Sequence, residues 1–137
     1  MPAHEIFVDT SAWIALTVED DAHHEAARRV YPELLQSYRR LVTTNLVIAE
    51  TYILLRKTAG YAPALLFLEM VMTSSRIEKV FSTAEHEVKA YELLKKYQDH
   101  DFSFTDAVSF VVMKERKIRE AFTFDQHFRI AGYQLIP

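Results

Sequence analysis

The feature that most constrains the fold of this chain is a repeated change of pattern along it. Short apolar, partly β-branched runs alternate with longer segments whose apolar residues recur at helical spacing. The short runs, which are typical of buried strands, are residues 6–8, 41–43, 77–81 and 121–124, with a last edge strand expected at 134–136. Strands that alternate with helices predict an α/β fold, with a parallel sheet covered on both faces.

The segments between these runs carry the signals of helices. Helical spacing predicts helices over about 12–16, 22–38, 46–58, 61–73 and 104–116, and one short helical turn at 125–130. A capping-box pattern at 82–85 predicts the start of a further helix that runs to about residue 97.

Length and composition limit the class of protein. The 137 residues predict one domain, 1–137, and no apolar stretch reaches the ~18 residues that a membrane span needs. Residues 1–5 lack the pattern of a signal peptide. The absence of cysteine excludes disulfides and thiolate metal sites. We therefore expect a cytoplasmic protein without a membrane partner. The net charge of −3 argues against bulk electrostatic coating of nucleic acid, but not against an enzyme with a local basic patch and a bound cation.

Three acidic residues stand where strands end or helices begin. Asp9 follows the first apolar run and precedes Thr10 and Ser11, and Asp125 follows the run that ends at residue 124. Asp106 is the fourth residue of a Ser-Phe-Thr-Asp sequence that matches a capping box. Taken singly, each of the three is explained as a helix cap.

Glu50 lies inside the helix predicted over 46–58. Its neighbours one turn away are all apolar: Leu46, Val47, Ile53 and Leu54. This spacing predicts that the Glu50 carboxylate lies in the middle of a buried stripe. A buried carboxylate must be paired, protonated or bound to metal. A sideways ion pair with an arginine, or a contact with a helix N-terminus, remains the simpler alternative for Glu50 alone.

Together the four acids suggest a shared site. In a parallel α/β sheet the strand ends and the helix starts that follow them gather at one edge. Four carboxylates there would repel one another unless a cation neutralised them, and oxygen ligands without cysteine favour Mg²⁺ or Mn²⁺. Such a site can polarise a phosphodiester and activate water. The sequence therefore predicts a metal-dependent phosphodiesterase.

Two alternatives from other functional classes remain. The first is a metal-dependent phosphatase on a similar sheet. Haloacid-dehalogenase-like phosphatases, however, carry a second Asp two residues after the first, where this chain has Ser11, and the acidic pair and lysine of receiver domains are not found. The second alternative is a non-catalytic interaction module. The acidic residues argue against it, because buried carboxylates that no metal neutralises would destabilise the folded protein.

Four blocks of the sequence also resemble a known family. Residues 7–11 (FVDTS), 45–51 (NLVIAET), 102–107 (FSFTDA) and 123–128 (TFDQHF) are similar to the blocks of PIN-domain nucleases, in the family's order and at similar spacing. The small size most resembles the VapC-like toxins of toxin–antitoxin pairs. The resemblance implies a three-layer α/β/α sandwich with a mostly parallel sheet. It also implies Mg²⁺- or Mn²⁺-dependent cleavage of RNA, a homodimer and a cognate antitoxin protein.

The resemblance also assigns roles to residues. Asp9, Glu50, Asp106 and Asp125 would be the catalytic and metal-binding acids, with Asp9 and Asp106 the surest ligands. Thr10, Ser11 and Thr105 would support the site or cap a helix. Asp101 is assigned to the loop or the cap, outside the site.

Contacts with RNA are less well defined by the sequence. The candidates are Lys114, Arg116, Lys117, Arg119 and His127. A solvated helix end is the commoner explanation of such basic residues, because cations near a helix C-terminus interact favourably with the helix dipole. A surface turn explains His127 equally well.

Overall fold

The computed structural model describes residues 3–137. Met1 and Pro2, part of the segment in which we expect no signal peptide, lie outside the described residues. Five parallel strands form one sheet in the order β3-β2-β1-β4-β5. The strands are β1 (Ala3–Val8), β2 (Tyr38–Thr44), β3 (Ile77–Val80), β4 (Glu120–Phe122) and β5 (Gln134–Ile136). The predicted parallel sheet is confirmed, including the edge strand at 134–136.

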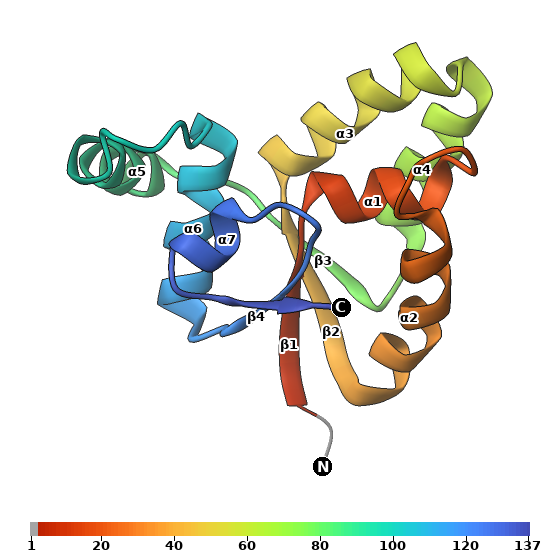
Figure 1. The fold of residues 1–137 in the computed structure, drawn as a ribbon, viewed down its shortest axis with the longest axis horizontal. Helices are drawn as coiled ribbons and strands as arrows, with labels where there is room; N and C mark the ends of the chain where they lie inside the picture. Colours follow the sequence, from red (N-terminus) through yellow and green to blue (C-terminus); the bar gives the residue numbers. More distant parts are fainter. Residues whose placement is uncertain (1–2) are drawn as a thin grey trace.

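The helices cover both faces of this sheet. They are α1 (Thr10–Thr17), α2 (His24–Ser37), α3 (Asn45–Thr58), α4 (Tyr61–Thr73), α5 (Ala84–Lys96), α6 (Phe104–Arg116) and α7 (His127–Ile130). In Figure 1 the first four lie on one side of the strands and the last three on the other. Crossovers between parallel strands are right-handed, so the direction in which the chain moves along the sheet decides which face the connecting helices cover. The chain first moves from β1 to β3 and later, after it has returned to β4, moves the other way to β5, which places the two groups of helices on opposite faces. The predicted three-layer α/β/α sandwich is confirmed.

The central strand β1 positions the end of the sheet at which Asp9 lies. Phe7 pairs with Val42 of β2 on one side and with Ala121 of β4 on the other. All three residues are fully buried, because helices cover both faces of the sheet. The carboxyl ends of β1, β2 and β4 therefore lie side by side in a rigid setting.

Local capping sets the starts of the helices at this edge. Thr44 caps α3 by accepting a hydrogen bond from the backbone N–H of Val47 at 3.1 Å. The predicted capping box of Ser103 and Asp106 is confirmed at the start of α6. The box expected at 82–85 is wrong by one residue, because the N-cap is Thr83 and its partner is the ring of His86.

No helix within residues 3–137 combines the length and the apolar character that crossing a bilayer requires.

Candidate active site

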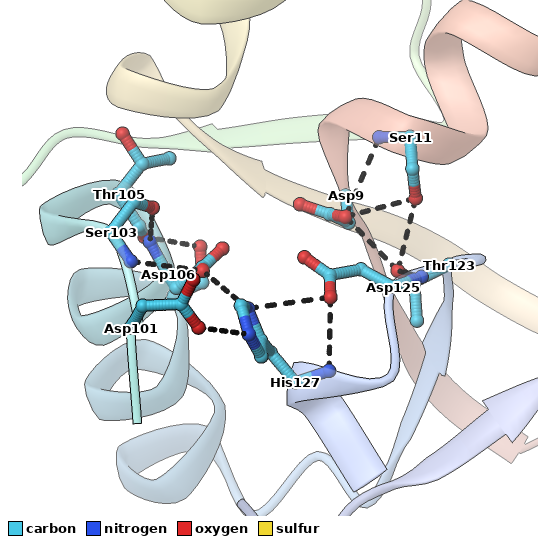
Figure 2. A network of polar contacts seen from close by, with 10 residues as sticks. Asp9, Ser11, Asp101, Ser103, Thr105, Asp106, Thr123, Asp125 and His127 are labelled. Atoms are coloured by element: carbon cyan, nitrogen blue, oxygen red, sulfur yellow. Dashed lines mark hydrogen bonds and ion pairs between the residues drawn. The ribbon is translucent and has the colours of Figure 1, made fainter. Parts of the chain in front are cut away.

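The structure brings all four predicted acids to one open pocket at the carboxyl edge of the sheet. The pocket has a volume of about 260 Å³. Its lining consists of Asp9, Thr10, Ser11, Ile14, Asp21, His23, Glu50, Leu54, Asp106 and Asp125. The acids reach it from the ends of two neighbouring strands and from the first two turns of two helices. Figure 2 shows the polar contacts among three of these acids and the residues around them.

Asp9 is at once the N-cap of α1 and the most buried acid of the pocket. Its Oδ2 accepts hydrogen bonds from the Ser11 hydroxyl at 3.0 Å and the Thr123 hydroxyl at 3.0 Å, and from the backbone N–H of Ser11 at 3.4 Å. Burial and the charge of Asp106 raise the pKa of Asp9 to about 6, although the hydrogen bonds from Thr123 and Ser11 act in the opposite direction. The cap and the site role are therefore compatible.

Asp106, like Asp9, takes part in capping a helix, here α6, and also lines the pocket. Its Oδ2 accepts a hydrogen bond from the backbone N–H of Ser103 at 3.1 Å, and the Ser103 hydroxyl accepts one from the N–H of Asp106 at 3.0 Å. Burial raises the pKa of Asp106, and the charge of Asp125 raises it further, while the hydrogen bond from Ser103 lowers it. The capping box thus holds a buried carboxylate of raised pKa at the pocket wall.

A serine and a threonine hydroxyl hold the two acid-bearing strand ends together. Besides binding Asp9, the Thr123 hydroxyl accepts the backbone N–H of Asp125 at 3.0 Å. The Ser11 hydroxyl lies 3.1 Å from that of Thr123 and accepts the N–H of Phe124 at 2.9 Å. Thr123 is the residue that sequence reasoning missed as part of the site. The available signal was its place two residues before Asp125, where a hydroxyl can bond to the following backbone.

His127 lies against the carboxylates of Asp106 and Asp125. Its Nδ1 is 3.4 Å from Asp106 Oδ2 and 3.4 Å from Asp125 Oδ1, and its Nε2 is 3.0 Å from Asp101 Oδ1. Burial lowers the pKa of His127, but the charge of Asp125 and the hydrogen bond to Asp101 more than offset this, and the net pKa is raised. Asp101, which we predicted to lie outside the site, is therefore connected to it through its contact with His127.

Glu50 lines the pocket but is not buried as predicted. The buried face of α3 consists of Val47, Ile48, Thr51 and Leu55. Ile53 and Leu54 are 43% and 39% exposed, and Glu50 is half-buried beside Leu54. The prediction of a buried stripe around Glu50 was wrong. Helix α3 packs on α1 and α4 over only part of its circumference, so some of its apolar residues face outward.

The hydroxyl residues predicted to support the site differ in position. Thr10 is buried in the pocket lining, and its hydroxyl has no hydrogen-bond partner among the described residues. Thr105 is not part of the pocket lining, although its carbonyl accepts a hydrogen bond from the Ser109 hydroxyl at 2.8 Å.

Of the five residues predicted to contact RNA, only His127 contacts the acids. Arg116 lies at the far end of α6, ten residues and thus about 15 Å along the helix from Asp106. Its guanidinium binds Glu5 at 2.6 Å and Glu78 at 2.8 Å, which ties α6 to β1 and β3. The exposed Lys114, Lys117 and Arg119 lie near the same end of α6. The structure therefore places this basic cluster away from the acidic pocket.

The chemistry of the pocket fits a divalent cation. Burial raises the pKa of both Asp9 and Asp106, and a neighbouring carboxylate raises each further, Asp106 for Asp9 and Asp125 for Asp106; a bound cation would relieve both effects. Asp106, Asp125 and His127 each offer a ligand atom, and these atoms lie within 4.8 Å of one another. The Thr10 hydroxyl, which has no hydrogen-bond partner within residues 3–137, is a further polar group in the pocket wall. A hard cation held among carboxylate oxygens can polarise a phosphodiester and activate water.

Comparison with known proteins agrees with this geometry. Residues 6–132 match the family model of the PIN domain. The chain is 37% identical over 129 residues to the 23S rRNA-specific endonuclease VapC20 of Mycobacterium tuberculosis, an alignment that covers 93% of this chain and 95% of that protein. It is 30% identical over 125 residues to a VapC ribonuclease of Archaeoglobus fulgidus, covering 90% of this chain and 78% of the relative.

Solved structures show the same likeness in three dimensions. The crystal structure of Mycobacterium tuberculosis VapC20, described as a sarcin–ricin loop cleaving toxin, matches with a TM-score of 0.86 at 34% identity, covering 93% of this chain and 95% of that one. VapBC2 from Rickettsia felis shares the fold, with a TM-score of 0.70 at 15% identity and 96% of each chain covered. The chain therefore belongs to the PIN domain family, and within it is similar to the VapC ribonucleases.

Proposed function

We propose that this chain is an endoribonuclease that hydrolyses RNA phosphodiester bonds with a divalent cation, and that it is the toxin of a toxin–antitoxin pair. The observation that carries the proposal is the convergence of Asp9, Glu50, Asp106 and Asp125 on one pocket. Similarity to VapC20 and to a VapC ribonuclease over nine-tenths of the chain supports the ribonuclease activity.

In this proposal the four acids have different roles toward the cation. Asp9 and Asp106, the two most buried, hold the cation, and Asp125 and Glu50 complete its surroundings directly or through water. When bound, Mg²⁺ or Mn²⁺ supplies a Lewis acid for the scissile phosphate and lowers the pKa of an attacking water. The hydroxyls of Ser11 and Thr123 fix the Asp9 carboxylate in one orientation through its Oδ2. The raised pKa of Asp9 means that this carboxyl holds a proton below about pH 6 in the metal-free protein, so cation binding below that pH should release it.

The relatives suggest where to look for the substrate and the partner. VapC20 is named as a 23S rRNA-specific endonuclease, and its crystal structure as that of a sarcin–ricin loop cleaving toxin. Ribosomal RNA is therefore the first substrate that we propose. A toxin requires a neutralising antitoxin protein, and we propose one here, together with a homodimer and a cytoplasmic site of action.

Cleavage of RNA by the purified protein tests the proposal. Intact ribosomes, naked ribosomal RNA and a sarcin–ricin loop oligonucleotide would be incubated with Mg²⁺, with Mn²⁺ or with chelator. The variants are Asp106→Asn and, as a matched control, Asp99→Asn on the exposed loop before α6. We expect cleavage by the wild type and by the control variant, and none with chelator or with Asp106→Asn.

Three results would each contradict part of the proposal. Cleavage that survives in Asp106→Asn would mean that the pocket is not the active site. A wild type that binds divalent cations but cleaves none of the three RNAs would exclude ribosomal RNA as the substrate. A wild type that neither binds cations nor cleaves would favour the non-catalytic interaction module.

A further inference from the structure

We propose that His127 is a nitrogen ligand of the cation in this pocket and that Asp101 holds its ring in the ligating orientation. The inference rests on the proposed metal site and adds an imidazole to its carboxylates. The consequence is a site that favours Mn²⁺ over Mg²⁺ more strongly than carboxylates alone, because imidazole suits transition metals while carboxylates and water suit Mg²⁺.

The first observation is the position of Nδ1. It lies 3.4 Å from one oxygen of Asp106 and 3.4 Å from one oxygen of Asp125. Adjacent ligands of a six-coordinate ion, each about 2.1 Å from the metal, lie about 3 Å apart. The spacing of the nitrogen from both oxygens is thus close to that of ligands on one ion. Figure 2 shows the ring between the two carboxylates, with its inner edge directed at both.

The second observation is that Nδ1 is a buried atom without a hydrogen-bond partner among the described residues. At 3.4 Å, neither carboxylate oxygen is within the usual range of a charge-assisted hydrogen bond. A cation among the three atoms would bind this nitrogen together with both oxygens, in place of the ion pairs that a protonated ring forms with them at 3.4 Å.

The third observation concerns the other ring nitrogen. Nε2 is 3.0 Å from a carboxylate oxygen of Asp101. An ionised carboxylate only accepts, so Nε2 carries a proton, and a ring that gives up its Nδ1 proton when the cation binds directs the Nδ1 lone pair toward Asp106 and Asp125. Metal-binding histidines commonly donate their second N–H to a carboxylate in this way, which fixes the tautomer and orients the ring.

The protein also restricts rotation of the ring. The backbone N–H of His127 donates to Asp125 Oδ1 at 2.9 Å, which fixes the start of α7 against the pocket. The ring packs edge-on against the buried Phe102, with the centroids 5.2 Å apart and an angle of 75° between the planes. The imidazole is therefore held in place before any ligand binds, as expected of a preorganised ligand.

An opposite role for His127 makes a different prediction. If the ring is a protonated counter-ion that merely neutralises Asp106 and Asp125, it competes with the metal for the same charges. Removing it would then tighten metal binding. If the ring is a ligand, removing it weakens metal binding, and weakens Mn²⁺ more than Mg²⁺. The sign of the change separates the two roles.

The experiment measures Mn²⁺ binding to the full chain without RNA. Titration calorimetry gives the Kd for Mn²⁺ and for Mg²⁺, and pulsed electron paramagnetic resonance of bound Mn²⁺ detects a directly coordinated ¹⁴N. The variants are His127→Gln and Asp101→Asn. The control is His100→Gln, an exposed histidine that stacks on the same Phe102 with a centroid distance of 5.6 Å. Circular dichroism checks that each variant is folded.

We expect ¹⁴N coupling in the wild type and in His100→Gln, and none in His127→Gln. The Kd for Mn²⁺ should rise by about tenfold in His127→Gln and by up to about tenfold in Asp101→Asn, with a smaller rise for Mg²⁺ in His127→Gln. Bound Mn²⁺ without ¹⁴N coupling in the wild type, or equal or tighter binding by His127→Gln, overturns this inference and leaves the carboxylate metal site standing. A wild type that binds no divalent cation overturns both.

Discussion

Replacing Asp9 by Asn should make the metal-free protein more stable at neutral pH. Asp9 is 3% exposed and sits beside Asp106, so its ionised form is unfavourable in the folded state, and its pKa is raised to about 6 from an ordinary 3.8. Asn has nearly the same shape and keeps an oxygen that can accept from the Ser11 and Thr123 hydroxyls, but it never carries the charge. The substitution therefore removes a destabilising term and retains the hydrogen bonds.

The size and the pH range of the effect follow from the pKa shift. A rise of about two pKa units, at about 1.4 kcal/mol each, corresponds to about 3 kcal/mol. Because the folded pKa lies above the unfolded one, wild-type stability is highest below pH 3.8, where Asp9 is protonated in both states. This part of the stability falls as pH rises through about 6. The variant should thus exceed the wild type by about 3 kcal/mol at pH 8, or about 10 °C in Tm, and by only about 0.5 kcal/mol at pH 4.

Urea and thermal denaturation with chelator, followed by the fluorescence of the single tryptophan, Trp13, measure the difference between pH 4.5 and 8.5. The control is Asp99→Asn, an exposed position where substitutions change stability by at most about 0.5 kcal/mol. With Mg²⁺ added, the wild type should gain more stability than Asp9→Asn, because at a given concentration a ligand that binds the folded state more tightly stabilises it more. Equal stability of the two proteins at pH 8 with chelator, or a difference that does not change with pH, would refute the reasoning.

Three further substitutions test the framework around the pocket. Arg116→Gln should lower the free energy of unfolding by about 2 kcal/mol, because two carboxylates lose a partly exposed partner. RNA cleavage at fixed salt should be unchanged, and a large loss would return Arg116 to the RNA interface. Ser103→Ala should cost about 1 kcal/mol in urea denaturation by removing the hydroxyl that accepts from the backbone N–H of Asp106 at the start of α6, and cleavage should slow because that turn then holds Asp106 less firmly. Phe110→Ala should cost about 3–5 kcal/mol, seen as a large drop in Tm, because the ring is 2% exposed.

The elements that the sequence predicted best depend on contacts within a few residues. The helices expected at 61–73 and 104–116 have those bounds in the structure. The capping box of Ser103 and Asp106 was also predicted correctly, because its two residues are three apart in the chain. The capping box expected at 82–85 was misplaced by one residue, because Ser82 and Thr83 are adjacent and both suit an N-cap, so the sequence motif does not distinguish them.

The parts that the sequence did not predict depend on contacts between distant residues. Glu50 has apolar neighbours on its helix, but how far each is buried depends on where α1 and α4 pack on α3. Arg116 was predicted to contact RNA or to be solvated at a helix end, but it pairs with Glu5 and Glu78, which are 111 and 38 residues away in the sequence. Such pairings follow from the placement of whole elements, and no local pattern encodes them.

The sequence by itself determined the alternation of strands and helices and the placing of three acids at strand ends and helix starts. Hydrophobic periodicity and capping chemistry are local, and a parallel sheet then gathers those positions at one edge. Only the tertiary structure decided which groups meet there. Because β4 lies beside β1, Thr123 bonds to Asp9 across 114 residues, and the return of α6 and α7 over the other face joins Asp101 to His127. The detailed coordination and charge of the pocket are therefore properties of the assembled fold.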